Sequence, residues 1–292
     1  MTRKTFLLID TNNLAYRVFH ALGTLSFNQI PTEVTFGLMR YIDKLSERFG
    51  TDNLIFCFDS RNPYRIQELP TYKESRRRRR ADAPEEEKQQ RAGLIKQLRD
   101  FRRDVLYDLG YVNVCFDAGF EADDLLAAVK KKLPPEDEKI IISSDQDLWQ
   151  LLDSNTIIWN PHNEKIFTQA VLKEKYNIDP ARWATVKAIA GCSSDDVPGV
   201  KGVGEKTAIK FLNNELGKKT KAFKAITEWV ASEEFLLSLR LVTLPYRRED
   251  LRDTMLHFEH YDNELSTKKW NQVCTDFGLK SLWKGKGKPK NG

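Results

Sequence analysis

The sequence contains no apolar run long enough to cross a membrane, which argues against a helical membrane protein. Its first residues, MTRKTFLLIDTNN, include an apolar stretch that is too short for a signal peptide. That stretch also ends in Asp instead of a small-residue cleavage site. We therefore expect a cytoplasmic protein without a membrane partner.

Cysteine is scarce and is not spaced for metal binding. The four cysteines show no CxxC pair, so the sequence suggests neither a zinc site nor a disulfide framework. Cys57 and Cys115 lie inside apolar runs, which is typical of buried core thiols. The chain also lacks an internal repeat. Its net charge is only +5, but 30% of its residues are charged, and the two signs are strongly segregated along the sequence.

Short apolar runs alternate with helix-like patterns over the first half of the chain. A chain of 292 residues, 40% of them hydrophobic, can form one large domain or two small ones. The runs predict buried strands at residues 5–9, 53–58, 112–116, 139–143 and 156–159. The patterns between them predict helices within residues 14–49, 86–109 and 122–133. This alternation predicts an α/β fold with a mostly parallel central sheet and helices on both faces. Beyond about residue 169 the pattern is helical, and residues 281–292 predict a basic flexible tail.

Acidic residues follow the predicted strands where each strand ends. The first strand ends in Asp10, the second in Asp59, and the fourth runs into SSDQD. The third is followed by GFEADDLLAAV, which places three carboxylates in four positions. Because functional groups gather beyond the carboxyl ends of parallel strands, we expect these acids to meet at one edge of the sheet. The set comprises Asp10, Asp59, Glu121, Asp123, Asp124, Asp145 and Asp147.

Seven carboxylates in one cleft cannot all stay ionised unless cations neutralise them. Their donor atoms are all oxygens, which suits Mg²⁺ or Mn²⁺ rather than Zn²⁺ or copper. There are more carboxylates than one ion needs, which indicates a pair of metals of the kind used in phosphoryl displacement. Taken singly, the acids have plainer interpretations. EADD could complement a helix dipole, Asp10 and Asp59 could be caps, and the Asp145/Asp147 pair could form a turn.

A basic segment separates the second and third predicted strands. Tyr72 and Lys73 precede five consecutive arginines at residues 76–80. Beside an acidic metal cleft, such cations would hold the phosphates next to the scissile one. Tyr72 could stack on a base or could simply pack. The alternative for the run is a solvated charged face, partly paired with the acids at residues 85–87.

Glycines are concentrated in the stretch AGCSSDDVPGVKGVGEKTA, residues 190–208. Gly199, Gly202 and Gly204 allow a tight hairpin, and its amides together with the next helix N-terminus could hold a phosphate. Lys206 adds positive charge there. Helical patterns on both sides predict a helix-hairpin-helix over about residues 183–216, a nonspecific grip on duplex backbone. A plain turn between two helices is the alternative.

Together these segments resemble the 5′ nuclease family. That family includes the 5′→3′ exonuclease domain of bacterial DNA polymerase I, phage 5′ exonucleases and flap endonucleases. The motifs that carry the resemblance are LLIDTNNLAYRVFHAL, YRIQELPTYKESR, GFEADDLLAAV, IISSDQDLWQLL, GCSSDDVPGVKGVGEKTA and LSLRLVTL, between about Thr5 and Leu244. The resemblance implies a PIN-like α/β nuclease core over residues 1–168, with a helical arch at about 64–92. A helical DNA-binding part over residues 169–280 would follow, with a potassium ion on the hairpin carbonyls at Gly202 and Gly204.

The resemblance also assigns roles to single residues. Lys73 and Arg76 match arch residues that handle the scissile phosphate, and Lys187 matches a basic DNA contact. Arg65 sits at a family arginine, which we assign to DNA binding together with Tyr72 and Lys206. The acids match two metal clusters, which with Lys73 and Arg76 form the expected catalytic set. The first cluster is Asp10, Asp59, Glu121, Asp123 and Asp124, and the second is Asp145, Asp147 and Asp195.

Two positions depart from the family pattern. The family commonly shows Asp after the glycine at 191, whereas this chain has Cys192. Asn usually follows the later aspartate, and here Asp196 stands instead. A thiol is a poor ligand for Mg²⁺ because it is soft and mostly protonated at neutral pH. We therefore expect either a weaker second metal site or Asp196 as the substitute ligand.

These expectations describe a 5′→3′ exonuclease and structure-specific flap endonuclease that uses Mg²⁺, or Mn²⁺ in its place. Its expected substrates are DNA with 5′ ends, flaps or forks, and RNA-primer removal from RNA–DNA hybrids (RNase H-like) fits the family too. We expect a monomer with a replication role, replication proteins as partners, and the host cytoplasm as its location if a phage encodes it. One alternative is a noncatalytic branched-DNA binding protein, which only Cys192 favours. Another is a toxin-like PIN ribonuclease, against which the hairpin and the chain length argue.

Overall fold

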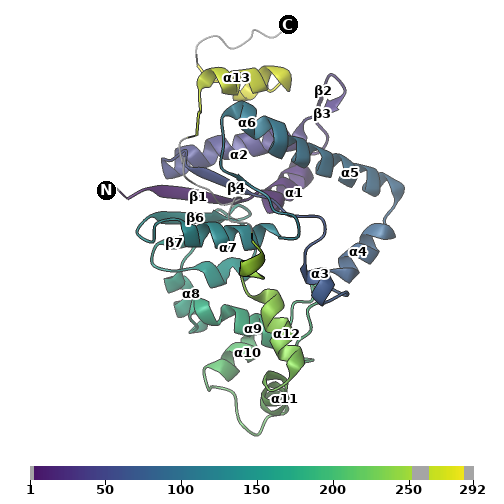
Figure 1. Ribbon diagram of the computed structural model, residues 1–292, viewed down its shortest axis with the longest axis vertical. Helices are drawn as coiled ribbons and strands as arrows, with labels where there is room; N and C mark the ends of the chain where they lie inside the picture. The colour runs from purple at the N-terminus through teal and green to yellow at the C-terminus, as the bar shows by residue number, and fades with distance from the viewer. Residues whose placement is uncertain (1–2, 252–262, 286–292) are drawn as a thin grey trace.

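A six-stranded sheet forms the centre of the molecule, in the order β5-β4-β1-β6-β7-β8 (Figure 1). The computed structural model describes residues 3–251 and 263–285. Within this sheet β1, β4, β5, β6 and β7 pair in parallel, and β8 is antiparallel to β7. The prediction of a mostly parallel α/β sheet is therefore confirmed. The strands are β1 (Thr5–Asp10), β4 (Leu54–Cys57), β5 (Val114–Cys115), β6 (Glu138–Ile142), β7 (Thr156–Asn160) and β8 (Lys165–Phe167).

The central strand β1 is apolar on both faces because both faces are covered. Leu7 and Ile9 pack in one hydrophobic core, while Phe6 and Leu8 pack in the other. Successive side chains of a strand point to opposite faces, so this alternation follows from the pleat. A strand buried on both sides reads as a continuous apolar run, which is why TFLLI predicted it correctly.

Helices cover both faces of the sheet (Figure 1). One face carries α1 (Thr11–Leu22), α2 (Glu33–Phe49), α5 (Glu85–Asp100), the π-helical turn η1 (Phe101–Val105), α6 (Leu106–Leu109) and α13 (Thr267–Asp276). On the other face α7 (Ala122–Lys132) and η2 (Asp147–Leu151) contact the sheet, and the same core includes α8 (Gln169–Tyr176) and α9 (Trp183–Ala190). Helices α10 (Glu205–Leu212), α11 (Lys221–Val230) and α12 (Glu233–Val242) pack on α9, farther from the sheet. Short 3₁₀ turns lie at η3 (Pro180–Arg182), η4 (Arg248–Asp250) and η6 (Lys280–Leu282).

The helix predicted within residues 14–49 is interrupted by a small hairpin. Helix α1 ends before Gly23, and β2 (Ser26–Phe27) pairs with β3 (Ile30–Pro31) before α2 begins. The hairpin turns through Asn28 and Gln29, which both have positive φ, as two-residue hairpin loops require. The sequence offers only Asn28 as a signal for this turn. Strand β8 was not predicted either, because it is short and half exposed.

The segment in which an arch was expected contains α3 (Arg65–Glu68) and α4 (Glu74–Ala81), which run away from the sheet and return to it through α5 (Figure 1). Within the described residues beyond 169, no strand occurs, as predicted. Helices α9 and α10 flank the glycine-rich hairpin. Residues 286–292 of the predicted tail lie outside the described part of the chain. Among the helices of residues 3–251 and 263–285, none combines the length and apolar character needed to span a bilayer.

Replacing Gly37 by Ala should destabilise the fold, because α1 and α2 approach closely at this residue. A Cβ at position 37 would lie 2.0 Å from Cγ1 of Val18. We expect the free energy of unfolding to fall by about 1–3 kcal/mol, as overpacking typically does. The matched control is Gly93→Ala in α5, where a Cβ would meet nothing within 4 Å. Denaturant unfolding should show this variant stabilised by about 0.5–1 kcal/mol, and equal effects at the two sites would contradict the packing argument.

Candidate metal centre and active site

Acidic side chains converge beyond the carboxyl ends of β1, β4 and β6. Asp10 is the last residue of β1 and caps α1, since the Asn13 amide donates to Oδ1 at 3.0 Å. Ser143, just after β6, donates its hydroxyl to Oδ2 of Asp10 at 2.8 Å. Asp59 follows β4 and accepts a hydrogen bond from the Ala122 amide at the start of α7, at 2.8 Å. One cleft of about 1160 Å³ is lined by Asp10, Asp59, Glu121, Asp123 and Asp145, as the order of the strands predicts.

The carboxylates in this cluster repel one another, and burial adds to the cost of ionising them. Burial, followed by the charge of Asp59, raises the pKa of Asp10 to about 7. Asp59 is reachable by solvent, yet restricted hydration at the cleft floor, followed by the charge of Glu121, raises its pKa to about 6. Burial and the charge of Asp145 raise the pKa of Asp123 well above its usual range. The cluster therefore holds protons near neutral pH unless another cation replaces them.

Glu121 behaves in the opposite way because two cations touch it. Lys73 Nζ lies 2.5 Å from Oε1 of Glu121, and Arg65 lies 3.1 Å from Oε2. Burial opposes ionisation most strongly, but Lys73 and then Arg65 outweigh it and lower the pKa of Glu121 to about 2. Lys73 also lies 3.8 Å from Asp195. This ammonium therefore connects the two acidic groups that the sequence analysis separated.

Asp124 is paired rather than free. Its carboxylate is fully buried and receives two bonds from the Arg65 guanidinium, at 2.6 and 2.8 Å. The backbone amides of Tyr246 and Glu121 donate to the same two oxygens. Asp124 was predicted as a metal ligand, but each of its oxygens is already occupied by protein donors. It joins α7 to α3 and to the segment after α12.

Three predicted DNA contacts point inward instead. Arg65 is only 3% exposed and donates Nε to the carbonyl of Leu241. Tyr72 is also buried and donates its hydroxyl to Glu121 at 2.7 Å, so it cannot stack on a base. Lys187 lies 2.9 Å from Asp147 and 3.1 Å from Glu205. In this structure the carboxylates hold these donors as partners, and their contacts with DNA stay predictions.

A second acidic group lies across Lys73 from the first. Ligand atoms of Asp147, Cys192 and Asp195 all lie within 4.8 Å of one another. Asp147 begins η2, which is anchored by Trp149 against Trp183 of α9, with ring centroids 4.7 Å apart. The Cys192 and Val197 backbones pair across a tight loop. Asp195 lies on that loop, and its Oδ1 is 3.0 Å from Nη2 of Arg76. Burial, then the charge of Asp195, raises the pKa of the Cys192 thiol.

Asp196 does not join this group. It is partly exposed and accepts hydrogen bonds from the Ser75 amide at 2.8 Å and the Ser75 hydroxyl at 2.6 Å. The Ser75 hydroxyl is the main reason that the pKa of Asp196 is lowered. Both carboxylate oxygens are therefore held by Ser75 at the start of α4, and the role of Asp196 as a substitute metal ligand stays a prediction.

The cleft also contains arginines that sequence reasoning missed. Arg91 and Arg99 on α5 and Arg102 on η1 line it together with Arg79 and Arg80 on α4. The guanidinium of Arg102 lies 3.6 Å from the centre of the Phe116 ring. Their recurrence along the 86–109 helical pattern could have indicated a basic face. The cleft therefore combines an acidic floor with basic walls.

The glycine hairpin presents its tip to solvent. Gly202, Gly204 and Lys206 are exposed, and Lys201 beside them is exposed too. Behind the tip the backbone is tightly packed, because a Cβ at Gly199 would lie 2.2 Å from the Gly191 amide nitrogen. Gly202, with φ +79, adopts a backbone conformation that glycine favours.

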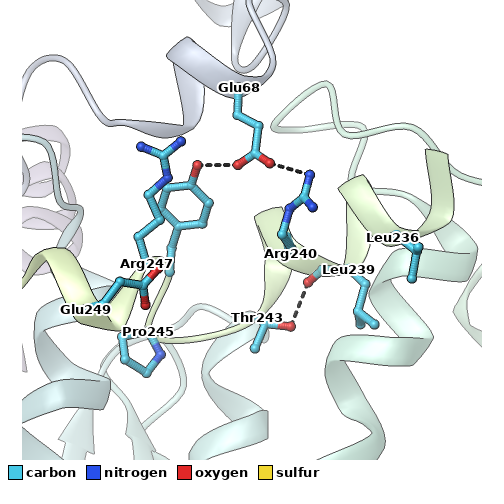
Figure 2. A pocket seen from close by; sticks show the side chains of 9 residues that line it. Glu68, Leu236, Leu239, Arg240, Thr243, Pro245, Arg247 and Glu249 are labelled. Atoms are coloured by element: carbon cyan, nitrogen blue, oxygen red, sulfur yellow. Dashed lines mark hydrogen bonds and ion pairs between the residues drawn. The ribbon is translucent and has the colours of Figure 1, made fainter. Parts of the chain in front are cut away.

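A separate hollow of about 720 Å³ lies at the base of the arch, where α3 meets α12. Figure 2 shows Glu68 there, paired with Arg240, whose Nη2 lies 2.5 Å from Oε1. The Tyr246 hydroxyl donates to the other oxygen of Glu68 at 2.5 Å. This network ties the arch to the helical part, and none of the acids of the metal cluster lines it.

The matching family profile and several similar proteins are described as 5′ exonucleases. The family profile described as "5′-3′ exonuclease, N-terminal resolvase-like domain" matches residues 5–177. The thermostable DNA polymerase I of Thermus aquaticus is 39% identical over 209 residues, which cover 70% of this chain but only 23% of the polymerase. A 5′-3′ exonuclease of Aquifex aeolicus is 29% identical and is matched over 94% of its length by 96% of this chain. The fold resembles that of T5 5′-exonuclease with bound zinc, with a TM-score of 0.71, 23% identity, and coverage of 83% and 90% of the two chains.

Removing the Arg65 guanidinium should strongly destabilise the protein, because it would leave Asp124 as a buried, unpaired carboxylate. For Arg65→Met we expect the free energy of unfolding to fall by about 3–5 kcal/mol. The matched control is Arg240→Met, whose ion pair with Glu68 is solvent-exposed on the arginine side and should contribute less than about 1 kcal/mol. Denaturant unfolding of both variants checks the prediction, and similar losses would contradict it.

In the presence of EDTA, the free energy of unfolding should fall as the pH rises from about 4 to about 7. The folded-state pKa values of Asp10 (about 7) and Asp59 (about 6) exceed the ordinary 3.8, so the folded state holds protons that the unfolded state has already released. Asp10→Asn should flatten this slope, and the exposed Asp108→Asn should not. Stability curves at pH 5 and pH 8, with EDTA and with Mg²⁺, provide the measurement. Stabilisation by Mg²⁺ that does not grow with pH would contradict the prediction.

Proposed function

The chain belongs to the 5′-3′ exonuclease family, and from this membership we propose that it is a metal-dependent 5′→3′ exonuclease and flap endonuclease. The reaction is hydrolysis of phosphodiester bonds near the 5′ ends of DNA. One observation carries the proposal: five carboxylates form the floor of a cleft whose walls carry arginines from α4 and α5. Acids alone would repel a nucleic acid, so the basic walls bring the backbone to them.

The residues of the floor fit Mg²⁺ or Mn²⁺. Their donors are oxygens, and the raised pKa values of Asp10 and Asp59 mark a shortage of positive charge at that place. Asp10, Asp59 and Asp123 would hold an ion directly, with Glu121 and Asp145 beside them. When bound, the metal supplies Lewis-acid stabilisation of the phosphate and a more acidic water.

Lys73 and Arg76 contribute positive charge at the start of α4. Both side chains are partly exposed, and both contact Asp195. A phosphate entering the cleft would compete with these carboxylates for the same donors. Held next to the scissile group, the two cations would stabilise the charge that develops on its oxygens.

The hairpin supplies the second contact with DNA in this proposal. The exposed amides near Gly202 and Gly204, with Lys201 and Lys206, suit a duplex phosphate or a potassium ion that bridges to one. We assign residues 1–168 to the nuclease core, 64–92 to the arch, and 169–280 to the DNA-binding part. A pair of divalent ions (Mg²⁺ at the floor and a second ion near Asp147 and Asp195), activity on flaps, forks and RNA–DNA hybrids, a monomeric state, action in the cytoplasm and replication proteins as partners belong to the same proposal. The polymerase activity of the longer relatives does not.

Cleavage of a labelled 5′ flap in Mg²⁺ but not in EDTA tests the proposal. Asp123→Asn should lower the cleavage rate by about 100-fold or more, because it removes a carboxylate from the ion site. The exposed Asp108→Asn should cleave like the wild type. Binding of the flap without cutting would instead support a noncatalytic branched-DNA binding protein. Preferential cutting of single-stranded RNA would support a ribonuclease.

A further inference from the structure

The group formed by Asp147, Cys192 and Asp195 differs in chemistry from the all-oxygen cluster at the floor of the cleft. We propose that it is a mixed carboxylate–thiolate site that binds a thiophilic divalent ion, such as Zn²⁺ or Co²⁺, in preference to Mg²⁺. The proposal deepens the proposed function, because Lys73 and Arg76 connect this group to the cleft. Its ligation chemistry, however, can be tested without nuclease activity.

The geometry already approaches that of an ion site. The three ligand atoms lie within 4.8 Å of one another. With zinc–sulfur and zinc–oxygen bonds of about 2.3 and 2.1 Å, tetrahedral coordination places two ligand atoms of one ion about 3.6 Å apart, so these atoms must approach one another by roughly 1 Å. Small side-chain rotations therefore suffice. The pairing with Val197 fixes the backbone of Cys192, a residue that is 6% exposed and whose Sγ lies 3.1 Å from Oγ of Ser194, while Asp147 is positioned at the start of η2.

Cys192 decides which ion fits. Mg²⁺ demands six oxygens in near-ideal octahedral geometry, and a sulfur at this position offers it none. Soft thiolate ligands select zinc and similar ions, while the two carboxylates remain acceptable to them. On binding, the thiol releases its proton to solvent as the metal–sulfur bond forms, so no oxidant or further reactant is needed.

The surrounding cations have alternative partners when an ion enters. Lys187 contacts both Asp147, at 2.9 Å, and Glu205, at 3.1 Å. If Asp147 turns to the ion, the pair with Glu205 retains the ammonium in place. Arg76, released from Asp195, faces the cleft that it already lines. Binding of the ion therefore leaves no buried cation unpaired, and it frees a guanidinium for phosphate.

Cobalt titration of the metal-free full chain provides the test. Thiolate ligation gives a near-ultraviolet charge-transfer absorption, which we expect to saturate at one equivalent of Co²⁺. Cys192→Ser should abolish it, and Cys274→Ser, which alters a buried cysteine of α13 outside this group, should retain it. Zn²⁺ should displace the cobalt signal, and a 100-fold excess of Mg²⁺ should not. The proposal is overturned if the wild type lacks the band or if the band survives in Cys192→Ser.

A second variant guards against misfolding of Cys192→Ser. Cys192→Asp restores the aspartate that the family pattern shows at this position, and it should lose the cobalt band while binding Mg²⁺ roughly tenfold more tightly by calorimetry. Unchanged Mg²⁺ affinity counts against the proposal. A cobalt band in a chain that fails to cut flaps would reject the nuclease function alone. Flap cleavage by a chain without the band would reject this inference alone.

Discussion

Repulsion among carboxylates at one edge of the sheet is the interaction on which the rest of the site depends. The parallel strands deliver Asp10, Asp59 and Asp145 to the same edge, and α7 adds Glu121 and Asp123. Where a cation is supplied by the chain, as Lys73 is to Glu121, the acid is ionised even at low pH. Where none is supplied, as at Asp10, the pKa rises. The pattern of satisfied and unsatisfied acids therefore outlines where an external ion belongs.

Of the seven acids that the sequence placed at this edge, five line the cleft, because the causes of their placement are local, while Asp124 and Asp147 have other partners. Each buried strand is an apolar run, and the residue that ends it must lie at the sheet edge. Asp10 and Asp59 could therefore be placed from the chain order alone, as could the start of α7 at Glu121. The same local logic located the helices that flank the glycine hairpin, since tight turns leave a signature in composition.

The pairings that the sequence did not predict share a different cause, which is contact between distant parts of the chain. Arg65 meets Asp124 across 59 positions, and Ser75 meets Asp196 across 121. A sequence shows that a residue is charged, but not which partner will claim it or whether the pair will be buried. For this reason Arg65, Tyr72 and Lys187 were assigned to DNA although the fold turns them inward. Such pairings have no short-range signal.

One such long-range contact joins the arch to the hairpin region. The Lys73 amide donates to the Asp195 carbonyl at 2.8 Å, and Ser75 is held by Asp196, so the root of α4 rests on the loop between α9 and the hairpin. A duplex seated on the hairpin and a strand passing beneath α4 would thus be held at a constant separation. The cleavage position would then be set by its distance from the bound duplex and not by the base sequence.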